Sequence, residues 1–184
     1  MKEHGPWKIK SSVVKYENPW IEVREDQVIR PDGKDGLFGV VTMKSGASIL
    51  ALDDEGYVYL TEEFRYALGR ISVEVVSGAL DDGENLLQAA QRELKEEAGI
   101  EAEEWIDLGI VNPFTSIIDS PANIYLARKL RVTDDLRHEG TEVITLHKIK
   151  FEEVLNMVME NKITHAASCV LILKAARFLE QEGV

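Results

Sequence analysis

The stretch GALDDGENLLQAAQRELKEEAGI, residues 78–100, decides how the rest of the chain is interpreted. Its apolar residues recur every three or four positions from Glu84 to Ala98, which predicts a helix with one apolar stripe. Gly99 stands where a glycine commonly ends a helix in the left-handed conformation. Gly78 permits a turn out of a preceding strand. We therefore expect a strand, a turn and a helix that stops at Gly99.

Three acidic side chains share one side of this predicted helix. Glu93 and Glu97 are one helical turn apart, and Glu96 lies beside them. Like charges at this spacing destabilise a helix, and Arg92 and Lys95 compensate them only in part. Oxygen ligands suit a hard ion such as Mg²⁺, which binds a few carboxylates together with phosphate oxygens. A solvated charged face is the alternative interpretation for such a helix when its flanking residues are ignored.

Short alternating runs bounded by turn residues predict strands on both sides of this helix. They cover residues 7–16, 20–29, 39–43, 47–52, 57–62, 71–76, 105–111, 123–127 and 142–149. Two further helical patterns cover residues 151–161 and 165–182. This order of elements indicates a layered α+β or α/β/α fold.

The composition restricts the partners of the protein. The 184 residues include 33 Asp plus Glu against 21 Lys plus Arg, a formal charge of −12. That sign opposes binding of long nucleic acid, although a metal ion can still join carboxylates to a small phosphorylated ligand. No apolar run is long enough to span a membrane, and Cys169, the single cysteine, excludes an intramolecular disulfide. We expect a cytoplasmic protein, because the N-terminal residues lack a signal peptide pattern.

The spacing within residues 78–100 resembles the Nudix box, G-x5-E-x7-R-E-U-x-E-E-x-G-U, where U is aliphatic. The resemblance implies the Nudix fold, a mixed β-sheet between helices in an α/β/α sandwich. We expect a Nudix hydrolase domain over residues 46–184, and an N-terminal antiparallel β-strand region over residues 1–45 that contributes to dimerisation. The implied activity is hydrolysis of a nucleoside diphosphate linked to another moiety.

The residues of the box can be given separate roles. Glu93 and Glu97 are the first candidates for metal ligands, and Glu96 is a third candidate, either directly or through water. The resemblance adds the backbone carbonyl of Ser77 as a ligand. The other four positions are interpreted as structural, with Arg92 orienting a glutamate, Glu84 lying near the helix start, and glycines at the two ends: Gly78, Glu84, Arg92 and Gly99.

Two segments before the helix resemble the Q-Y-R and E-L-P-A-G segments of ADP-ribose pyrophosphatases. These are residues 62–66 and 74–78, where Val76 and Ser77 replace proline and alanine. The resemblance implies that Arg65 and Glu74 help to hold substrate, while an exposed charge at a strand end is the alternative for Arg65.

Further substrate contacts are expected outside these segments. Pro113 falls where the related enzymes have a proline-containing substrate loop, at a shorter spacing from the box. Trp20 is a candidate for stacking on a nucleobase, although a tryptophan in a small domain is more often part of the core.

A hydrolase of this kind also needs a base for the attacking water. The resemblance places an acidic base in the polar loop before the strand at residues 142–149. Glu139 is therefore the first candidate and Glu142 the alternative. His138 lies in the same loop, where a lone histidine is more often solvated.

These expectations lead to one function and two alternatives. The leading hypothesis is Mg²⁺-dependent hydrolysis of the pyrophosphate in ADP-ribose or a related nucleoside diphosphate sugar, with Mn²⁺ as the alternative ion and the protein acting as a homodimer. One alternative is cleavage of nucleoside triphosphates or dinucleoside polyphosphates. The other is a module that senses a nucleotide sugar without cleaving it.

Overall fold

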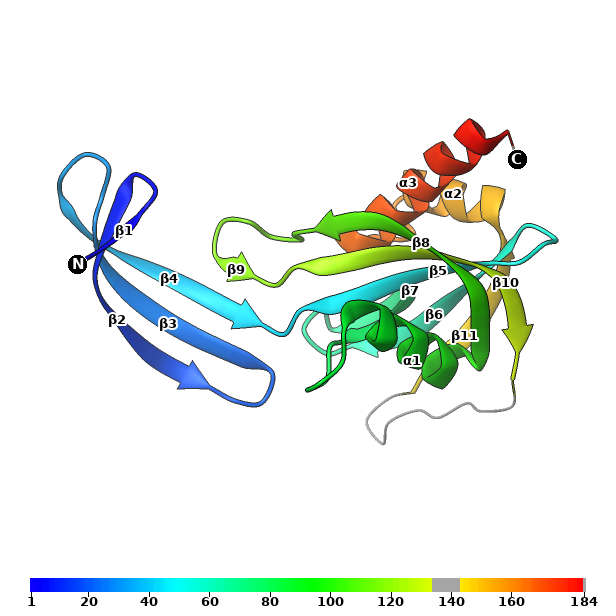
Figure 1. Ribbon diagram of the computed structural model, residues 1–184, viewed down its shortest axis with the longest axis horizontal. Helices are drawn as coiled ribbons and strands as arrows, with labels where there is room; N and C mark the ends of the chain where they lie inside the picture. Colours follow the sequence, from blue (N-terminus) through cyan, green and yellow to red (C-terminus); the bar gives the residue numbers. More distant parts are fainter. Residues whose placement is uncertain (134–142, 184) are drawn as a thin grey trace. The chain divides into compact units, whose positions relative to one another are not determined.

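The computed structural model describes residues 1–133 and 143–183. The chain divides into two compact units, each with its own β-sheet (Figure 1). The first unit comprises Met1–Lys44 and Asn112–Pro121, and the second comprises Ser45–Val111 and Ala122–Val184.

The sheet of the first unit has the strand order β1-β2-β3-β4-β9. Its strands are β1 (Lys2–His4), β2 (Trp7–Glu17), β3 (Ile21–Ile29), β4 (Asp35–Met43) and β9 (Ile118–Asp119). The first four pair antiparallel, as the alternating sequence predicts, and β9 pairs parallel with β4. Trp20 lies just before β3. The turn that leads into the strand is held by the side chain of Asn18, which accepts hydrogen bonds from the amides of Trp20 and Ile21 at 2.9 Å each.

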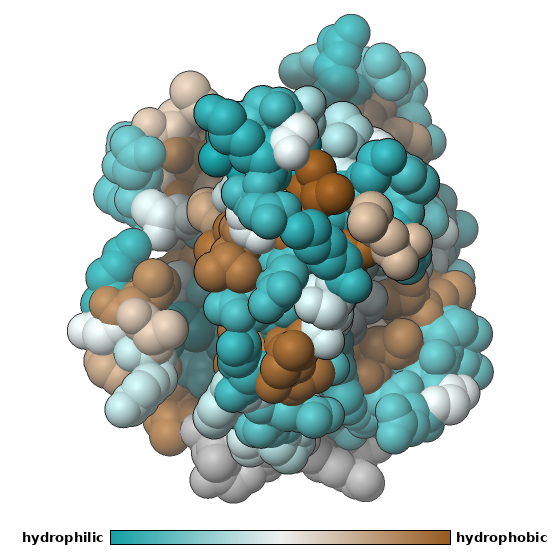
Figure 2. All heavy atoms as spheres, turned by 90° about the vertical axis from the view of Figure 1, so that its left-hand side faces the viewer, coloured by the Kyte–Doolittle hydropathy of each residue, from teal (hydrophilic) through white to brown (hydrophobic). Residues whose placement is uncertain are grey.

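The first unit has little hydrophobic core of its own. Every residue of the unit is described, and only Asp26 and Val28 are buried. The rings of Trp7 and Phe38 meet edge to face, with centroids 5.6 Å apart. Large apolar side chains such as Leu37 are exposed, and Figure 2 shows hydrophobic side chains as separate patches within a largely hydrophilic surface. The strands of this unit therefore bury little apolar area within the unit.

The sheet of the second unit is mixed, as the sequence predicts. Its strand order is β11-β6-β7-β5-β10-β8, and β10 runs parallel to β5 while the other pairs are antiparallel. The strands are β5 (Gly46–Leu52), β6 (Tyr57–Arg65), β7 (Arg70–Ala79), β8 (Ile100–Val111), β10 (Ala122–Val132) and β11 (Thr145–Lys150).

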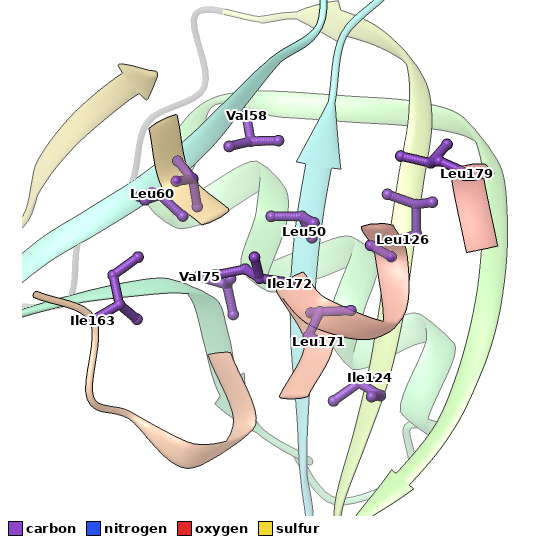
Figure 3. Close-up of a cluster of buried hydrophobic side chains, with 12 residues drawn as sticks. Leu50, Val58, Leu60, Val75, Ile124, Leu126, Ile163, Leu171, Ile172 and Leu179 are labelled. Carbon is purple, nitrogen blue, oxygen red and sulfur yellow. The ribbon is translucent and has the colours of Figure 1, made fainter. Parts of the chain in front are cut away.

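Helices cover both faces of this sheet. The helices are α1 (Leu86–Ala98), α2 (Phe151–Met159) and α3 (Ala166–Glu182). Because successive side chains of a strand point to opposite faces, Ile49 of β5 packs in one buried cluster with Leu94 of α1, and Leu50 packs in another with Leu171 of α3 (Figure 3). The expected α/β/α sandwich of the Nudix fold is thereby confirmed.

Helix α1 begins two residues later than the periodicity predicts. Asn85 is its N-cap and forms a capping box, in which its side chain accepts from the amide of Gln88 at 3.0 Å while the Gln88 side chain accepts from the Asn85 amide at 2.9 Å. Glu84 therefore lies before the helix. Gly99 ends the helix with φ of 63°, and its N–H bonds to the carbonyls of Leu94 and Lys95, as predicted.

Within the described ranges, none of the helices has the length and apolar character that crossing a membrane requires.

Candidate active site

The carboxylate of Glu93 lies directly against the backbone of Gly78. A Cβ atom at position 78 would stand 1.9 Å from both Cδ and Oε1 of Glu93. Glu93 reaches this place from α1, while Gly78 is near the end of β7 and pairs with Ala47 of β5. The prediction of a turn at Gly78 was wrong, because the residue lies within β7, and the glycine is instead needed for the close approach of this carboxylate.

A second carboxylate of the helix is buried. Glu97 lies one turn after Glu93 and is only 7% exposed, although it carries a formal charge. Carboxylates are almost never this buried unless they are paired or bind a cation. The Glu93–Glu97 side of α1 is thus a partly desolvated acidic surface and not the solvated face that a charged helix otherwise presents.

Arg92 connects Glu84, which lies before helix α1, to Glu93 and Glu96 on the helix. Its Nε and Nη2 donate to the two carboxylate oxygens of Glu84 at 3.0 and 3.2 Å. Its Nη1 donates to Glu93 at 2.8 Å and to Glu96 at 3.1 Å. Its Nη2 also donates to the carbonyl of Ala79, at 3.0 Å. One guanidinium therefore links the turn after β7 to the acidic side of α1.

These contacts keep Glu84 and Arg92 ionised. The hydrogen bonds from Arg92 hold the pKa of Glu84 below its ordinary value. The same bonds, opposed by desolvation and helped by Glu93, raise the pKa of Arg92. Neither group changes its charge near neutral pH, so the linkage between Arg92 and Glu84 persists there.

The donor atoms fit a hard divalent cation in type. The candidate ligands Glu93, Glu96 and Glu97 offer only carboxylate oxygens, and Ser77 precedes Gly78 on β7. Among residues 1–133 and 143–183, no three acidic, histidine or cysteine side chains are already gathered in a metal-binding arrangement. The bonds from Arg92 to Glu93 and Glu96 direct one oxygen of each carboxylate toward the guanidinium.

Arg65 and Glu74 form a second charged cluster in the same unit. They come from the adjacent strands β6 and β7, and Nε and Nη2 of Arg65 donate to the two carboxylate oxygens of Glu74 at 3.2 and 2.8 Å. Nη1 of Arg65 lies 2.6 Å from Glu63. Glu74 is 5% exposed, whereas the Arg65 side chain is 36% exposed. The pair therefore consists of a buried carboxylate and a partly exposed guanidinium.

Both members of this pair remain charged. Burial opposes ionisation of each, but their mutual hydrogen bonds lower the pKa of Glu74 and raise that of Arg65. The charge of Glu97 also raises the pKa of Arg65. The Arg65–Glu74 pair and the acidic side of α1 thus act on one another electrostatically.

His165 is a neighbour of this pair that the sequence did not indicate. Its Nδ1 lies 3.5 Å from Oε2 of Glu74. The sequence predicts only a helical pattern over residues 165–182. No local pattern signals the contact, because it depends on how the start of α3 packs against β7.

The remaining candidates lie elsewhere. Trp20 and Pro113 both belong to the first unit, where both are exposed, and their contacts with substrate stay predictions. Glu139, its alternative Glu142 and His138 lie outside the described residues. The described chain before them ends at Thr133, whose amide and hydroxyl both donate to the carbonyl of Gly99, at 2.6 and 3.1 Å. Thr133 therefore lies beside the C-terminal end of α1.

Known proteins resemble the chain along most of its length. A model of the nucleoside diphosphate sugar hydrolase N-terminal domain matches residues 7–41, and a model of the NUDIX domain matches residues 42–167. An ADP-ribose pyrophosphatase from Bacillus subtilis is 27% identical over 153 residues, 83% of each chain. Another from Mycobacterium tuberculosis is 29% identical over 154 residues, 82% of this chain and 74% of the other.

A solved structure has the same fold. It is a crystal structure of an ADP compounds hydrolase, with a TM-score of 0.85 and 17% sequence identity, and the match covers 100% of this chain and 99% of the other. The NUDIX model spans well over half of the chain and includes both charged clusters. With the carboxylate packed on Gly78 and the arginine that links the box glutamates, these matches lead to one conclusion: the chain belongs to the NUDIX family and is a Nudix hydrolase.

Proposed function

We propose that this enzyme hydrolyses the pyrophosphate bond of ADP-ribose or a related nucleoside diphosphate sugar, giving a nucleoside monophosphate and a sugar phosphate. The observation that carries the proposal is the position of the Glu93 carboxylate, packed on Gly78 and one turn from the buried Glu97. The match of residues 7–41 to a nucleoside diphosphate sugar hydrolase domain and the ADP-ribose pyrophosphatase relatives support the substrate class.

Nudix hydrolases use divalent metal ions, and we propose Mg²⁺ here, with Mn²⁺ as the alternative. Glu93, Glu96, Glu97 and the carbonyl of Ser77 are the proposed ligands. A bound ion would neutralise diphosphate charge and lower the pKa of water. Arg92 holds Glu93 and Glu96 in place through its hydrogen bonds, which is the role expected of a group that orients metal-binding carboxylates.

Arg65 is the proposed diphosphate-binding residue. Its contacts with Glu74 and Glu63 among the described residues use Nε and one N–H of each terminal nitrogen. A guanidinium has five N–H donors, so donors remain for phosphate oxygens. Because Glu74 takes two parallel bonds, it sets the plane of the guanidinium. Trp20 and Pro113 are proposed as further substrate contacts from the first unit.

The proposed function is tested by identifying products. The purified protein is incubated with ADP-ribose and Mg²⁺, and the products are separated by ion-exchange chromatography. We expect AMP and ribose 5-phosphate in equal amounts, and no turnover after chelation of the metal. Inorganic pyrophosphate released from nucleoside triphosphates, with ADP-ribose left intact, would instead indicate the triphosphate alternative. Tight binding of ADP-ribose without cleavage would indicate a sensing module.

Glu139 is the proposed base for the attacking water. We expect Glu139→Gln to lower kcat by about a hundredfold, the lower end of the range for general bases, because a bound ion also acidifies water. Glu142→Gln is the matched variant in the same segment and should change kcat by less than about threefold. The measurement is steady-state hydrolysis of ADP-ribose at saturating Mg²⁺. A large loss in Glu142→Gln alone would transfer the role to Glu142, and no loss in either would remove the base from this segment.

A homodimer is proposed as the working state. The first unit buries only Asp26 and Val28, so its strands bury little apolar area without further contacts. Small-angle scattering of the full chain checks the assembly, and a monomeric mass at micromolar concentration would contradict the proposal. A cytoplasmic location likewise stays a prediction from the sequence.

A further inference from the structure

The start of helix α3 is bonded to strand β7 beside the Arg65–Glu74 pair. His165 is the residue before α3, and its Nδ1 lies 2.9 Å from Oγ of Ser168 and 3.5 Å from Oε2 of Glu74. Oγ of Ser168 accepts a hydrogen bond from the amide of Val75 at 3.0 Å. Ser168 is fully buried, so this contact fixes the first turn of α3 next to the backbone that carries Glu74.

Nδ1 of His165 lies between two oxygen atoms, one from the Glu74 carboxylate and one from the Ser168 hydroxyl, which also accepts the Val75 amide. The hydroxyl can donate to Nδ1 or accept from it, so the 2.9 Å contact ties the ring to Ser168 in either tautomer. The ring is thereby fixed with Nδ1 against Oε2 of Glu74, at 3.5 Å.

Burial is the main reason that the His165 ring is neutral near pH 7. Burial lowers the pKa of His165, and Arg65 on β6 lowers it further, while Glu74 on β7 opposes them. Arg70 on β7 lies nearby through its hydrogen bond to the hydroxyl of Thr164. A neutral ring can lie against the Glu74 carboxylate without competing with the guanidinium of Arg65 for its charge.

We propose that His165 is a positioning residue, which holds the Glu74 carboxylate in the orientation that presents Arg65 to the substrate diphosphate. The inference rests on the proposed function of Arg65. Glu74 has its two oxygens on the guanidinium, and His165 borders Oε2 from the side of α3. Without the ring, Glu74 and Arg65 can rotate together, and the guanidinium loses its fixed plane.

Three substitutions at position 165 separate positioning from general stability. His165→Asn keeps an amide group where Nδ1 stands, His165→Gln moves the amide one bond further out, and His165→Ala removes it. We expect Ala and Gln to raise KM for ADP-ribose roughly tenfold, as for other groups that orient a binding residue, with kcat within about twofold of wild type. Asn should restore KM to within about threefold. Melting temperatures of all three variants should stay within about 4 °C of wild type.

A double substitution tests whether the effect passes through Arg65. Arg65→Ala alone should raise KM strongly, and adding His165→Ala to it should cause no further rise, because the positioned group is already absent. Additive effects in the double variant, or an unchanged KM in His165→Ala, would overturn the proposal. An equal loss in Asn, Gln and Ala would also overturn it, because it would indicate loss of packing.

A titration without substrate separates this inference from the proposed function. The ring resonances of His165 are assigned by their loss in His165→Asn and followed against pH by NMR. In Glu74→Gln the pKa of His165 should fall below its wild-type value, because the carboxylate that opposes its burial is gone. An unchanged pKa would show that the ring does not act on Glu74. Should ADP-ribose not be a substrate, the fall would still be seen while every KM measurement failed.

Discussion

Replacing Glu97 with Gln is expected to lower kcat for ADP-ribose by roughly four orders of magnitude, about 5 kcal/mol in activation free energy, with the fold intact. The amide has the shape of the carboxylate but lacks its charge, so it cannot hold a divalent cation in the same way. Glu97 is 7% exposed, and burying a neutral amide costs less than burying an anion. Stability should therefore not fall with activity.

The measurement combines steady-state kinetics at saturating Mg²⁺ with thermal melting followed by circular dichroism. Glu103→Gln is the matched control, because Glu103 is an exposed residue of β8 outside the site and the substitution changes the net charge equally. We expect the control to keep wild-type kcat. Turnover near the wild-type value in Glu97→Gln, with a normal melting curve, would refute the assignment of this side of α1 as the metal site.

The substitution Gly78→Ala should inactivate the enzyme through Glu93. The added methyl group would stand 1.9 Å from the Glu93 carboxylate, and no carboxylate can remain there. Because the displaced atoms are the far end of a flexible side chain, the helix can stay in place while the carboxylate moves. We expect kcat to fall about a thousandfold and the melting temperature to change by only a few degrees.

Two other glycines serve as comparisons for Gly78→Ala. Gly39 on β4 has no atom within 4 Å of an added Cβ, so Gly39→Ala should keep both activity and stability. At Gly46 the added Cβ would meet the backbone carbonyl oxygen of Gly78 at 2.7 Å. Gly46→Ala should therefore lower the free energy of unfolding by about 1–3 kcal/mol. Loss of folding in Gly78→Ala, comparable to that in Gly46→Ala, would contradict a displacement confined to Glu93.

Local patterns predicted most elements of the fold. The period of the box residues predicted α1, and only its first residues differ, because the capping box at Asn85 and Gln88 begins the helix later than the apolar stripe alone indicates. The pattern around Leu50 predicted strand β5. It did not predict that one face of this strand packs against α1 and the other against α3. The resemblance predicted a substrate loop at Pro113, and no local signal predicted that β9, which follows Pro113, pairs with β4.

Local patterns likewise predicted some contacts of the candidate site and not others. The glutamates of α1 are close in sequence, so helical geometry alone placed them together. Arg65 and Glu74 were identified by separate segments. The register of β6 and β7 pairs Arg65 with Arg70 and Thr61 with Glu74, so the two are not directly opposite and meet through the length of the Arg65 side chain. The contact of His165 with Glu74 joins a helix start to a distant strand. Such contacts depend on the packing of whole layers, which no short pattern contains.

The guanidinium of Arg92 also determines how the protein should behave without its metal. Because this internal counter-ion already offsets part of the repulsion among Glu84, Glu93 and Glu96, the acidic helix does not depend on an external cation to form. We therefore expect metal binding and folding to be separate equilibria, unlike in small domains that fold only around their ion. Without the ion the protein should stay folded, and the activity of the enzyme should depend on the free concentration of the ion.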